Sequence, residues 1–308
     1  MKQQLSEEMF RPVDKDVARH DEVADAEPSL SFWQDAWRRL KQNKLAMAGF
    51  WAIILLIIMS IVGPWINEFT YEQQNLVMKN MGPSAEHWFG TDSFGRDLFT
   101  RTWYGARISL FIGITAALID LIIGVIWGGI AGYYGGKVDE FMMRFCDILY
   151  GLPYMLVVVL LMVVLGQGIF TIIIAMTITG WVGMARIVRG EVLRLKEQEY
   201  VLASQSLGAK TSRVLFKHLI PNALGPILVT LTLTIPNAIF TEAFLSFLGL
   251  GVQAPIASWG TMTNDGLESL RYYPWLLFFP ATFISITMLA FNVLGDGLRD
   301  ALDPRLRK

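Results

Sequence analysis

Residues 106–133 read ARISLFIGITAALIDLIIGVIWGGIAGY, a run whose only charged side chains are Arg107 and Asp120. A helix of about 20 apolar residues spans the hydrocarbon core of a bilayer, because lipid offers no partner for unpaired backbone groups. Five further predominantly apolar runs cover residues 45–66, 141–165, 169–188, 224–248 and 275–294. The sequence therefore predicts an all-α polytopic membrane protein with six transmembrane helices.

The composition supports a membrane protein and excludes several other classes. Hydrophobic residues make up 53% of the 308 residues and charged residues only 17%, against about 25% charged residues in ordinary soluble domains. Lys and Arg (26) nearly balance Asp and Glu (27), so no overall field attracts nucleic acid. One cysteine, Cys146, and three histidines leave no internal disulfide and little material for a metal site.

The distribution of lysine and arginine predicts the orientation of the spans. These residues gather around residues 38–44, 137–144, 186–217 and 299–308, and cationic flanks stay on the cytoplasmic side. Both termini are then cytoplasmic. The predicted parts are a disordered cytoplasmic tail (1–30), an interfacial amphipathic helix (31–44), the first span (45–66), an extracytoplasmic loop (67–105) and a core domain holding spans two to six (106–308).

The interfacial helix is predicted from its start signal and its apolar face. Ser31 and Gln34 have the spacing of a capping box. Trp33, Trp37 and Leu40 follow at helical spacing, so we expect the rings to point to the lipid headgroups. The alternative is a polar tail that merely leads into the first span.

Residues 199–221, EYVLASQSLGAKTSRVLFKHLIP, are too polar to span a membrane and too apolar for a free loop. Gly208 suits the left-handed cap that ends a short helix. Ser212 is expected to start a second short helix, which Pro221 would terminate. Isolated helices this short are unstable in water. We therefore expect them to dock, either on the cytoplasmic end of their own bundle or in a groove of a partner protein.

The spacing of Ala203, Gly208 and Pro221 resembles the signature loop of bacterial ABC importer permeases. The chain departs from that signature where Leu202-Ala203-Ser204 replaces a Glu-Ala-Ala triplet and where His218 stands at an aliphatic position. Three further blocks resemble the C-type permease subunit of oligopeptide and dipeptide importers, namely residues 87–97 (HWFGTDSFGRD), 242–251 (EAFLSFLGLG) and 295–304 (GDGLRDALDP).

The resemblance implies a type I ABC importer permease fold that forms half of the pathway of an ATP-driven oligopeptide importer in the bacterial cell membrane. It implies a homologous second permease, two ATPase subunits and an extracytoplasmic peptide-binding protein as partners, besides peptide and lipid. ATP and magnesium would bind to the ATPase subunits, so this chain would hold no cofactor and no catalytic residue. The cytoplasmic coupling loop would be residues 189–221, with ATPase contacts carried by Glu199, Ala203, Ser204, Gly208, Ala209, Lys210 and Pro221.

The residues themselves agree that the chain has no nucleotide site. Gly135-Gly136-Lys137 is the nearest approach to a phosphate loop, but Ala131 occupies the place of the first glycine and Val138 cannot ligate magnesium. We therefore expect no enzymatic activity in this chain.

Three polar residues in the predicted spans are candidates for the translocation path, namely Asp120, Asn237 and Glu242. An ionisable group within a membrane is costly and faces a bundle interior or a wet cavity. Asn237 follows Pro236, where a broken helical turn would free carbonyl groups. The alternative for both carboxyl groups is a structural pairing or a neutral state.

In the first outer loop, Asp92, Arg96 and Asp97 are candidates for contact with the binding protein or for an outer gate. The alternative is a structured loop in which Asp92 forms a cap and Arg96 pairs with Asp97. Two other functions remain open from the residues. One is a proton-coupled secondary peptide transporter that uses Asp120 and Glu242 as a relay, and the other is a membrane scaffold or receptor subunit.

Overall fold

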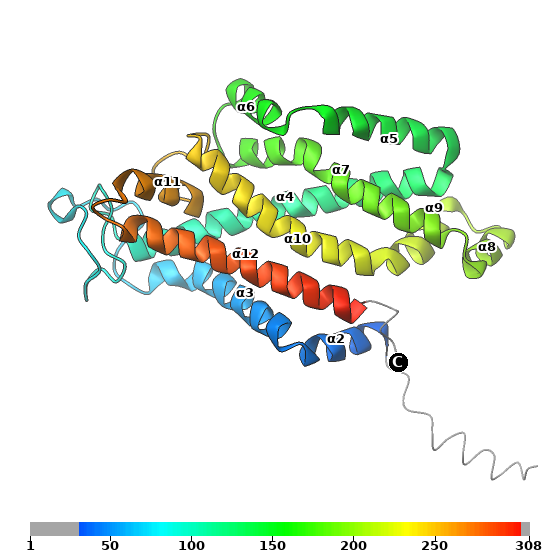
Figure 1. Cartoon of the computed structure of the whole chain (residues 1–308), viewed down its shortest axis with the longest axis horizontal. Helices are drawn as coiled ribbons and strands as arrows, with labels where there is room; N and C mark the ends of the chain where they lie inside the picture. The colour runs from blue at the N-terminus through cyan, green and yellow to red at the C-terminus, as the bar shows by residue number, and fades with distance from the viewer. Residues whose placement is uncertain (1–30, 303–308) are drawn as a thin grey trace, which may run out of the picture.

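The computed structural model describes residues 31–302, and in this range the chain consists of helices joined by turns, with one isolated bridge between Thr91 and Asp97 (Figure 1). The all-α prediction is confirmed for this part of the chain. The tail predicted at residues 1–30 lies outside the described residues. The α-helices are α2 (Phe32–Gln42), α3 (Lys44–Val62), α4 (Leu98–Tyr134), α5 (Gly136–Gly151), α6 (Tyr154–Leu165), α7 (Ile169–Leu195), α8 (Glu199–Ser206), α9 (Thr211–Arg213), α10 (Ile220–Phe247), α11 (Trp259–Ser269) and α12 (Trp275–Leu302).

Five helices in the described part of the chain are long and apolar enough to cross a membrane. They are Lys44–Trp65, which adds the 3-10 turn η2 (Gly63–Trp65) to α3, then α4, α7, the helix Thr211–Phe247 and α12. These helices confirm five of the six predicted spans. α4 begins at Leu98 and so extends into the region predicted as an extracytoplasmic loop.

The third predicted span, residues 141–165, is wrong as a continuous helix. The chain forms α5 and α6 instead, and their axes are bent by 80°. Pro153 explains the break, because its ring fixes its own φ and disfavours the helical conformation in the residue before it. Leu152 accordingly has an extended ψ of 132°. The two helices together provide a sixth candidate span or a broken one.

The long helices pack in pairs. α4 lies along α7, α3 lies along α12, and α10 contacts α12, α4 and α7 between these pairs (Figure 1). α5 and α6 lie beside α7 at the edge of the bundle. α11 packs against α12, α10 and α4. The bundle interior is therefore built mainly from α4, α7 and α10.

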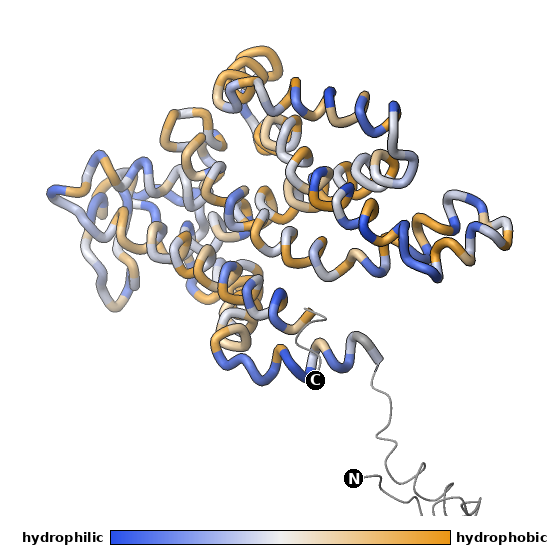
Figure 2. Tube along the Cα trace, turned by 45° about the vertical axis from the view of Figure 1, so that its right-hand side comes forward, coloured by the Kyte–Doolittle hydropathy of each residue, from blue (hydrophilic) through white to orange (hydrophobic). Residues whose placement is uncertain are grey.

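The two ends of the bundle carry different elements (Figure 1). α2, α8 and the last turn of α12 lie at one end, which we call the α8 end. The loop of residues 66–97, with its 3-10 turn η3 (Leu76–Met78), and α11 lie at the other, the α11 end. Figure 2 shows hydrophilic residues in α2, around α8 and in the 66–97 loop, with hydrophobic residues along the helices between them. This distribution is typical of a bundle whose middle lies in lipid.

Three glycines spaced four residues apart let α4 approach α7 closely. A Cβ on Gly124 would lie 2.6 Å from Met184 Cβ, and one on Gly132 would lie 2.9 Å from the carbonyl oxygen of Arg189. A Cβ on Gly128, between them, would overlap the carbonyl oxygen of Ala185. Such small-residue spacing is the usual way in which membrane helices bring their backbones together.

α2 has the predicted start signal. The capping box is confirmed, because Ser31 Oγ accepts from the N–H of Gln34 and the Gln34 side chain accepts from the N–H of Ser31. Leu40 is buried against α12, where a Cβ on Gly297 would meet its Cδ1. Trp37 is exposed, and Lys41 lies over its ring. The placement of α2 in the headgroup plane stays a prediction.

Candidate functional site

All seven residues predicted for the coupling loop lie in one compact segment at the α8 end, residues 199–221, which we call the elbow. α8 forms its first half. Gly208 follows with a φ of +77°, and its N–H donates to the carbonyl oxygen of Gln205 over 2.9 Å. Ala209 N–H donates to the carbonyl oxygen of Ser204 over 3.1 Å. The left-handed cap predicted at Gly208 is therefore confirmed.

The second half of the elbow differs from the prediction. The short helix begins at Thr211, but Pro221 does not terminate it, because α9 continues through the π-helical turn η4 (Val214–Leu219) into α10. A proline normally breaks a helix since it lacks an N–H and its ring meets the carbonyl four residues back. The wider π turn rearranges the carbonyls before Pro221, and Asn222 Nδ2 donates to the carbonyl oxygen of His218 over 2.6 Å. Residues Thr211–Phe247 thus form one unbroken helix.

One face of the elbow is fixed to the bundle. Val201, Val214 and Leu219 are fully buried in a cluster with Val188 and Val192 of α7. The elbow halves also touch each other, since Ser204 Oγ lies 3.4 Å from His218 Nε2 and the ring of Tyr200 lies near the His218 ring. The docking of these helices on their own bundle, which the sequence left open, is present for this face. The base of the elbow is consequently rigid.

The other face of the elbow is exposed and apolar. Leu207 at its tip is 89% exposed, and Leu202 and Phe216 are about half exposed. Ala203, Lys210 and Glu199 are also exposed, whereas Ser204 and Ala209 are half-buried. Sequence reasoning missed Phe216, although it recognised that this segment is too apolar for a free loop.

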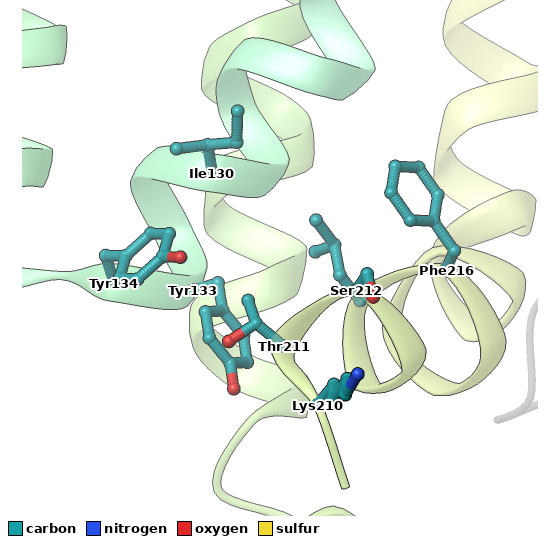
Figure 3. A pocket seen from close by; sticks show the side chains of 8 residues that line it. Ile130, Tyr133, Tyr134, Lys210, Thr211, Ser212 and Phe216 are labelled. Atoms are coloured by element: carbon teal, nitrogen blue, oxygen red, sulfur yellow. The ribbon is translucent and has the colours of Figure 1, made fainter.

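A groove of about 620 Å³ lies between the elbow and the end of α4. Figure 3 shows Tyr133 and Tyr134 on the α4 side and Lys210, Thr211 and Phe216 on the elbow side. Aromatic rings, a cation and hydroxyl groups line the same opening. This face can take up an amphipathic segment of another protein.

The polar residues of the outer loop bond to one another at the α11 end, as in the structured-loop alternative, but with other partners than that alternative gave. Arg96 Nε donates to Asp92 Oδ2 over 2.6 Å, and Asp97 is the residue that caps a helix. Asp92 also faces Arg101 at 3.3 Å. Register explains the difference, because Asp97 directly precedes the first residue of α4 and there accepts from the N–H of Thr100 over 2.8 Å.

Besides capping α4, Asp97 has further side-chain partners. It is almost fully buried, accepts from Asn67 Nδ2 over 2.9 Å and from Thr100 Oγ1 over 2.8 Å, and lies 2.8 Å from His87 Nδ1. It therefore joins the start of α4 to Asn67 and His87, which lie 30 and 10 positions earlier in the chain.

We expect Asp97→Ala to lower the free energy of unfolding by about 3 kcal/mol, because the cap and the buried partners of the carboxylate are lost together. Asn43→Ala is the matched control, since Asn43 caps α3 through a single bond to Ala46 N–H. It should cost about 1 kcal/mol. Thermal unfolding of the purified protein in detergent measures both. Equal losses for the two variants would contradict the role of the buried partners.

The three polar residues predicted for a translocation path lie apart. Asn237 is exposed on α10. Asp120 is buried on α4 against Gly180 of α7, and its Oδ1 has no hydrogen-bond partner among the described residues. Glu242 is fully buried and bonded to Ser109, which is 11 positions before Asp120 on α4, or about 16 Å along the helix. The two carboxyl groups therefore do not contact each other.

A second pocket, of about 640 Å³, opens at the α11 end. Arg96 and Arg101 line it on the side of the outer loop, and Asn264 and Asp265 line it on α11. The segment between α10 and α11 closes it with Gln253 and Pro255. The pocket combines both charge signs with amide groups, so it suits a polar protein surface or a peptide.

Two family models match the sequence. The one described as "Binding-protein-dependent transport system inner membrane component" matches residues 124–308, and "N-terminal TM domain of oligopeptide transport permease C" matches residues 31–83. Together they include the elbow, α11, α12 and the first span.

Curated relatives match over nearly the whole chain. The oligopeptide transport system permease protein OppC of Bacillus subtilis is 62% identical over 306 residues, which cover 99% of this chain and 100% of that protein. The dipeptide transport system permease protein DppC of the same species is 64% identical over 282 residues, 91% of this chain and 88% of that protein. OppC of Escherichia coli K12 is 46% identical over 90% of this chain and 92% of its own length.

A solved structure shares the fold. The MetNI methionine ABC transporter in an inward-facing conformation matches with a TM-score of 0.51 and 19% identity, over 65% of this chain and 94% of the transporter chain.

Proposed function

Because this chain belongs to the family of binding-protein-dependent transport inner membrane components, in its oligopeptide and dipeptide permease C branch, we propose that its elbow receives the force that drives peptide import. The chain is a multi-pass protein of the bacterial inner membrane and the permease of an ATP-driven importer. It acts in a complex with a second permease, ATPases and a binding protein. ATP is hydrolysed in separate subunits, so this chain is not itself an enzyme.

The observation that carries the proposal is the shape of the elbow. Its tip residue Leu207 is 89% exposed, while its base is buried against α7 and continues into α10. An exposed apolar tip on a rigid base binds a groove of a partner and transmits the partner's movement without bending. The ATPase subunit is that partner. The groove beside Lys210 and Phe216 widens the contact surface.

The contact between the elbow and the ATPase is the starting point for the proposed arrangement of the other subunits. We take the α8 end as the cytoplasmic end, because lysines and arginines gather there. α2 and the end of α12 then lie on the side that the sequence predicts for both termini. One homologous permease and two ATPase subunits complete the membrane and cytoplasmic parts. Each permease forms half of the path for short peptides, and Asn237, which is exposed on α10, is the candidate that lines it in this chain. The binding protein docks at the α11 end, over Asp92, Arg96 and Asp97 and the adjacent pocket.

Peptide uptake into vesicles tests the proposal. Vesicles contain the two permeases and two ATPase subunits, the peptide-loaded binding protein is added outside, and radiolabelled peptide inside is counted with and without internal ATP. We expect uptake that needs ATP and resists an uncoupler. Uptake by the permeases alone that an uncoupler abolishes would indicate a proton-coupled transporter, and ATP-independent signalling without uptake would indicate a receptor.

Leu207→Asp tests the contact itself. We expect it to lower the amount of ATPase that co-purifies with the tagged permeases about 10-fold, because a central apolar anchor is replaced by a charge. The fold should be unaffected, since Leu207 is 89% exposed. Val77→Asp is the control, because Val77 is 93% exposed in η3 at the α11 end. Equal ATPase retention in the two variants would refute the contact.

A further inference from the structure

We propose that Glu242 is a positioning residue that locks α11 to α10, so that movement of α11 at the outer end reaches the elbow. The inference rests on the proposed function of the elbow. It assigns to Glu242 a role in regulation by the binding protein and removes it from the set of path-lining candidates.

Glu242 joins three helices through hydroxyl groups. Its Oε2 accepts from Ser109 Oγ of α4 over 3.1 Å. Its Oε1 accepts from Ser246 Oγ of α10 over 2.9 Å and from Ser258 Oγ over 2.6 Å. Ser258 is the N-cap of α11. The side chain has no exposed surface, and its oxygens are directed at this chain's own groups rather than at a path.

The hydroxyl groups around Glu242 are oriented to donate to it. Ser258 Oγ already accepts from the N–H of Thr261, and Ser109 Oγ already accepts from the N–H of Trp259. Each of the two hydroxyls keeps its hydrogen for donation, and a carboxylate, which only accepts, receives both hydrogens. The N-terminus of α11 adds favourable partial positive charge next to Glu242.

The first turn of α11 packs too closely against α10 to move separately. A Cβ on Gly260 would lie 2.6 Å from Ala243 Cα. Trp259 is fully buried, and its Nε1 donates to the carbonyl oxygen of Thr102 over 2.9 Å. α11 is thus bonded to α4 and, through Glu242, to α10.

α10 carries the connection to the other end of the bundle. The unbroken helix Thr211–Phe247 is about 55 Å long. It starts at Thr211, directly after Lys210, so its first residues belong to the elbow, and it contains Glu242 near its far end. The residues Thr261, Asn264 and Asp265 of α11 line the outer pocket. A protein that binds in this pocket and moves α11 therefore also moves α10, and this movement reaches the elbow.

The test compares two serines that donate to the same oxygen, Glu242 Oε1. Ser258→Ala removes the bond between α11 and α10 together with the side-chain cap of α11, whereas Ser246→Ala removes a bond within α10 only. The five-chain complex is placed in lipid nanodiscs, and the readout is the ratio of ATP hydrolysis with peptide-loaded binding protein to hydrolysis without it. We expect Ser258→Ala to lower this ratio about 10-fold, as expected for the loss of a typical coupling energy. Ser246→Ala should retain the wild-type ratio.

Two more variants separate positioning from folding. Ser258→Thr keeps both the cap and the hydroxyl, so it should restore the ratio, and Glu242→Gln should lower it because the amide cannot accept from Ser109 and Ser258 together. A wild-type ratio in Ser258→Ala and Glu242→Gln would overturn the inference. Loss of assembled complex with an unchanged ratio in what remains would also overturn it, because the role would be structural. A wild-type complex without ATP-dependent uptake would instead refute the proposed function.

Discussion

Gly208→Val should abolish peptide uptake while the complex still assembles and hydrolyses ATP. Gly208 has a φ of +77°, which a β-branched residue adopts only at a cost of about 2 kcal/mol. Apart from Gly208 and its two chain neighbours, no heavy atom of the described residues lies within 4 Å of the position that a Cβ would take, so the variant acts through the backbone and not through a clash. α8 would change its direction relative to α10, so the ATPase would still bind the elbow but its movement would no longer be passed on to α10. Vesicle uptake and ATP hydrolysis, measured on the same preparation, show the uncoupling.

Gly208→Asn is the matched control, because asparagine tolerates the left-handed region better than other residues with a side chain. It adds a polar side chain at the same place and should retain most of the uptake. Full uptake by Gly208→Val, or equal loss in both variants, would contradict the view that the backbone at Gly208 sets the direction of α8.

Gly128→Ala should lower the free energy of unfolding by about 3 kcal/mol, because a Cβ inserted into a closely packed interface forces the helices apart. The new Cβ would overlap the carbonyl oxygen of Ala185. Backbone atoms cannot change rotamer to make room, so α4 would have to move away from α7. The apparent melting temperature of the purified permease in detergent should fall clearly.

The neighbouring residue provides the control. A Cβ on Gly129 would lie 3.5 Å from Leu215 Cδ1, which is an ordinary van der Waals contact with a flexible side chain. Gly129→Ala should therefore be neutral or slightly stabilising, because alanine favours a helix over glycine. A similar melting temperature in the Gly128 and Gly129 variants would show that the close approach of α4 and α7 does not stabilise the bundle.

Hydropathy was sufficient to predict the helical class and five of the spans, because a stretch such as residues 106–133 can satisfy its backbone groups in lipid only as a helix. Hydropathy failed to predict whether a proline interrupts a helix. Pro153 breaks the predicted third span by 80°, whereas Pro221 lies within a helix because a π turn precedes it. The two cases have the same local signal, and only the surrounding packing separates them.

The candidate functional residues also differ in whether the sequence could predict their contacts. The left-handed glycine at position 208 was predictable, since its cause is local. The cap at Asp97 was also within reach, because an aspartate directly precedes the long helix there. The bonds from Glu242 to Ser109 and Ser258 were not, since they join residues 133 and 16 positions apart. No period or spacing in the sequence marks such pairs.

A photo-reactive amino acid at position 207, in the complete complex in lipid, tests most directly whether the elbow is the contact with the ATPase. We expect light to link this chain to an ATPase subunit, and to produce no such link when the reactive group stands at position 77. Adducts confined to this chain's own helices, in a complex that hydrolyses ATP and takes up peptide, would contradict the account.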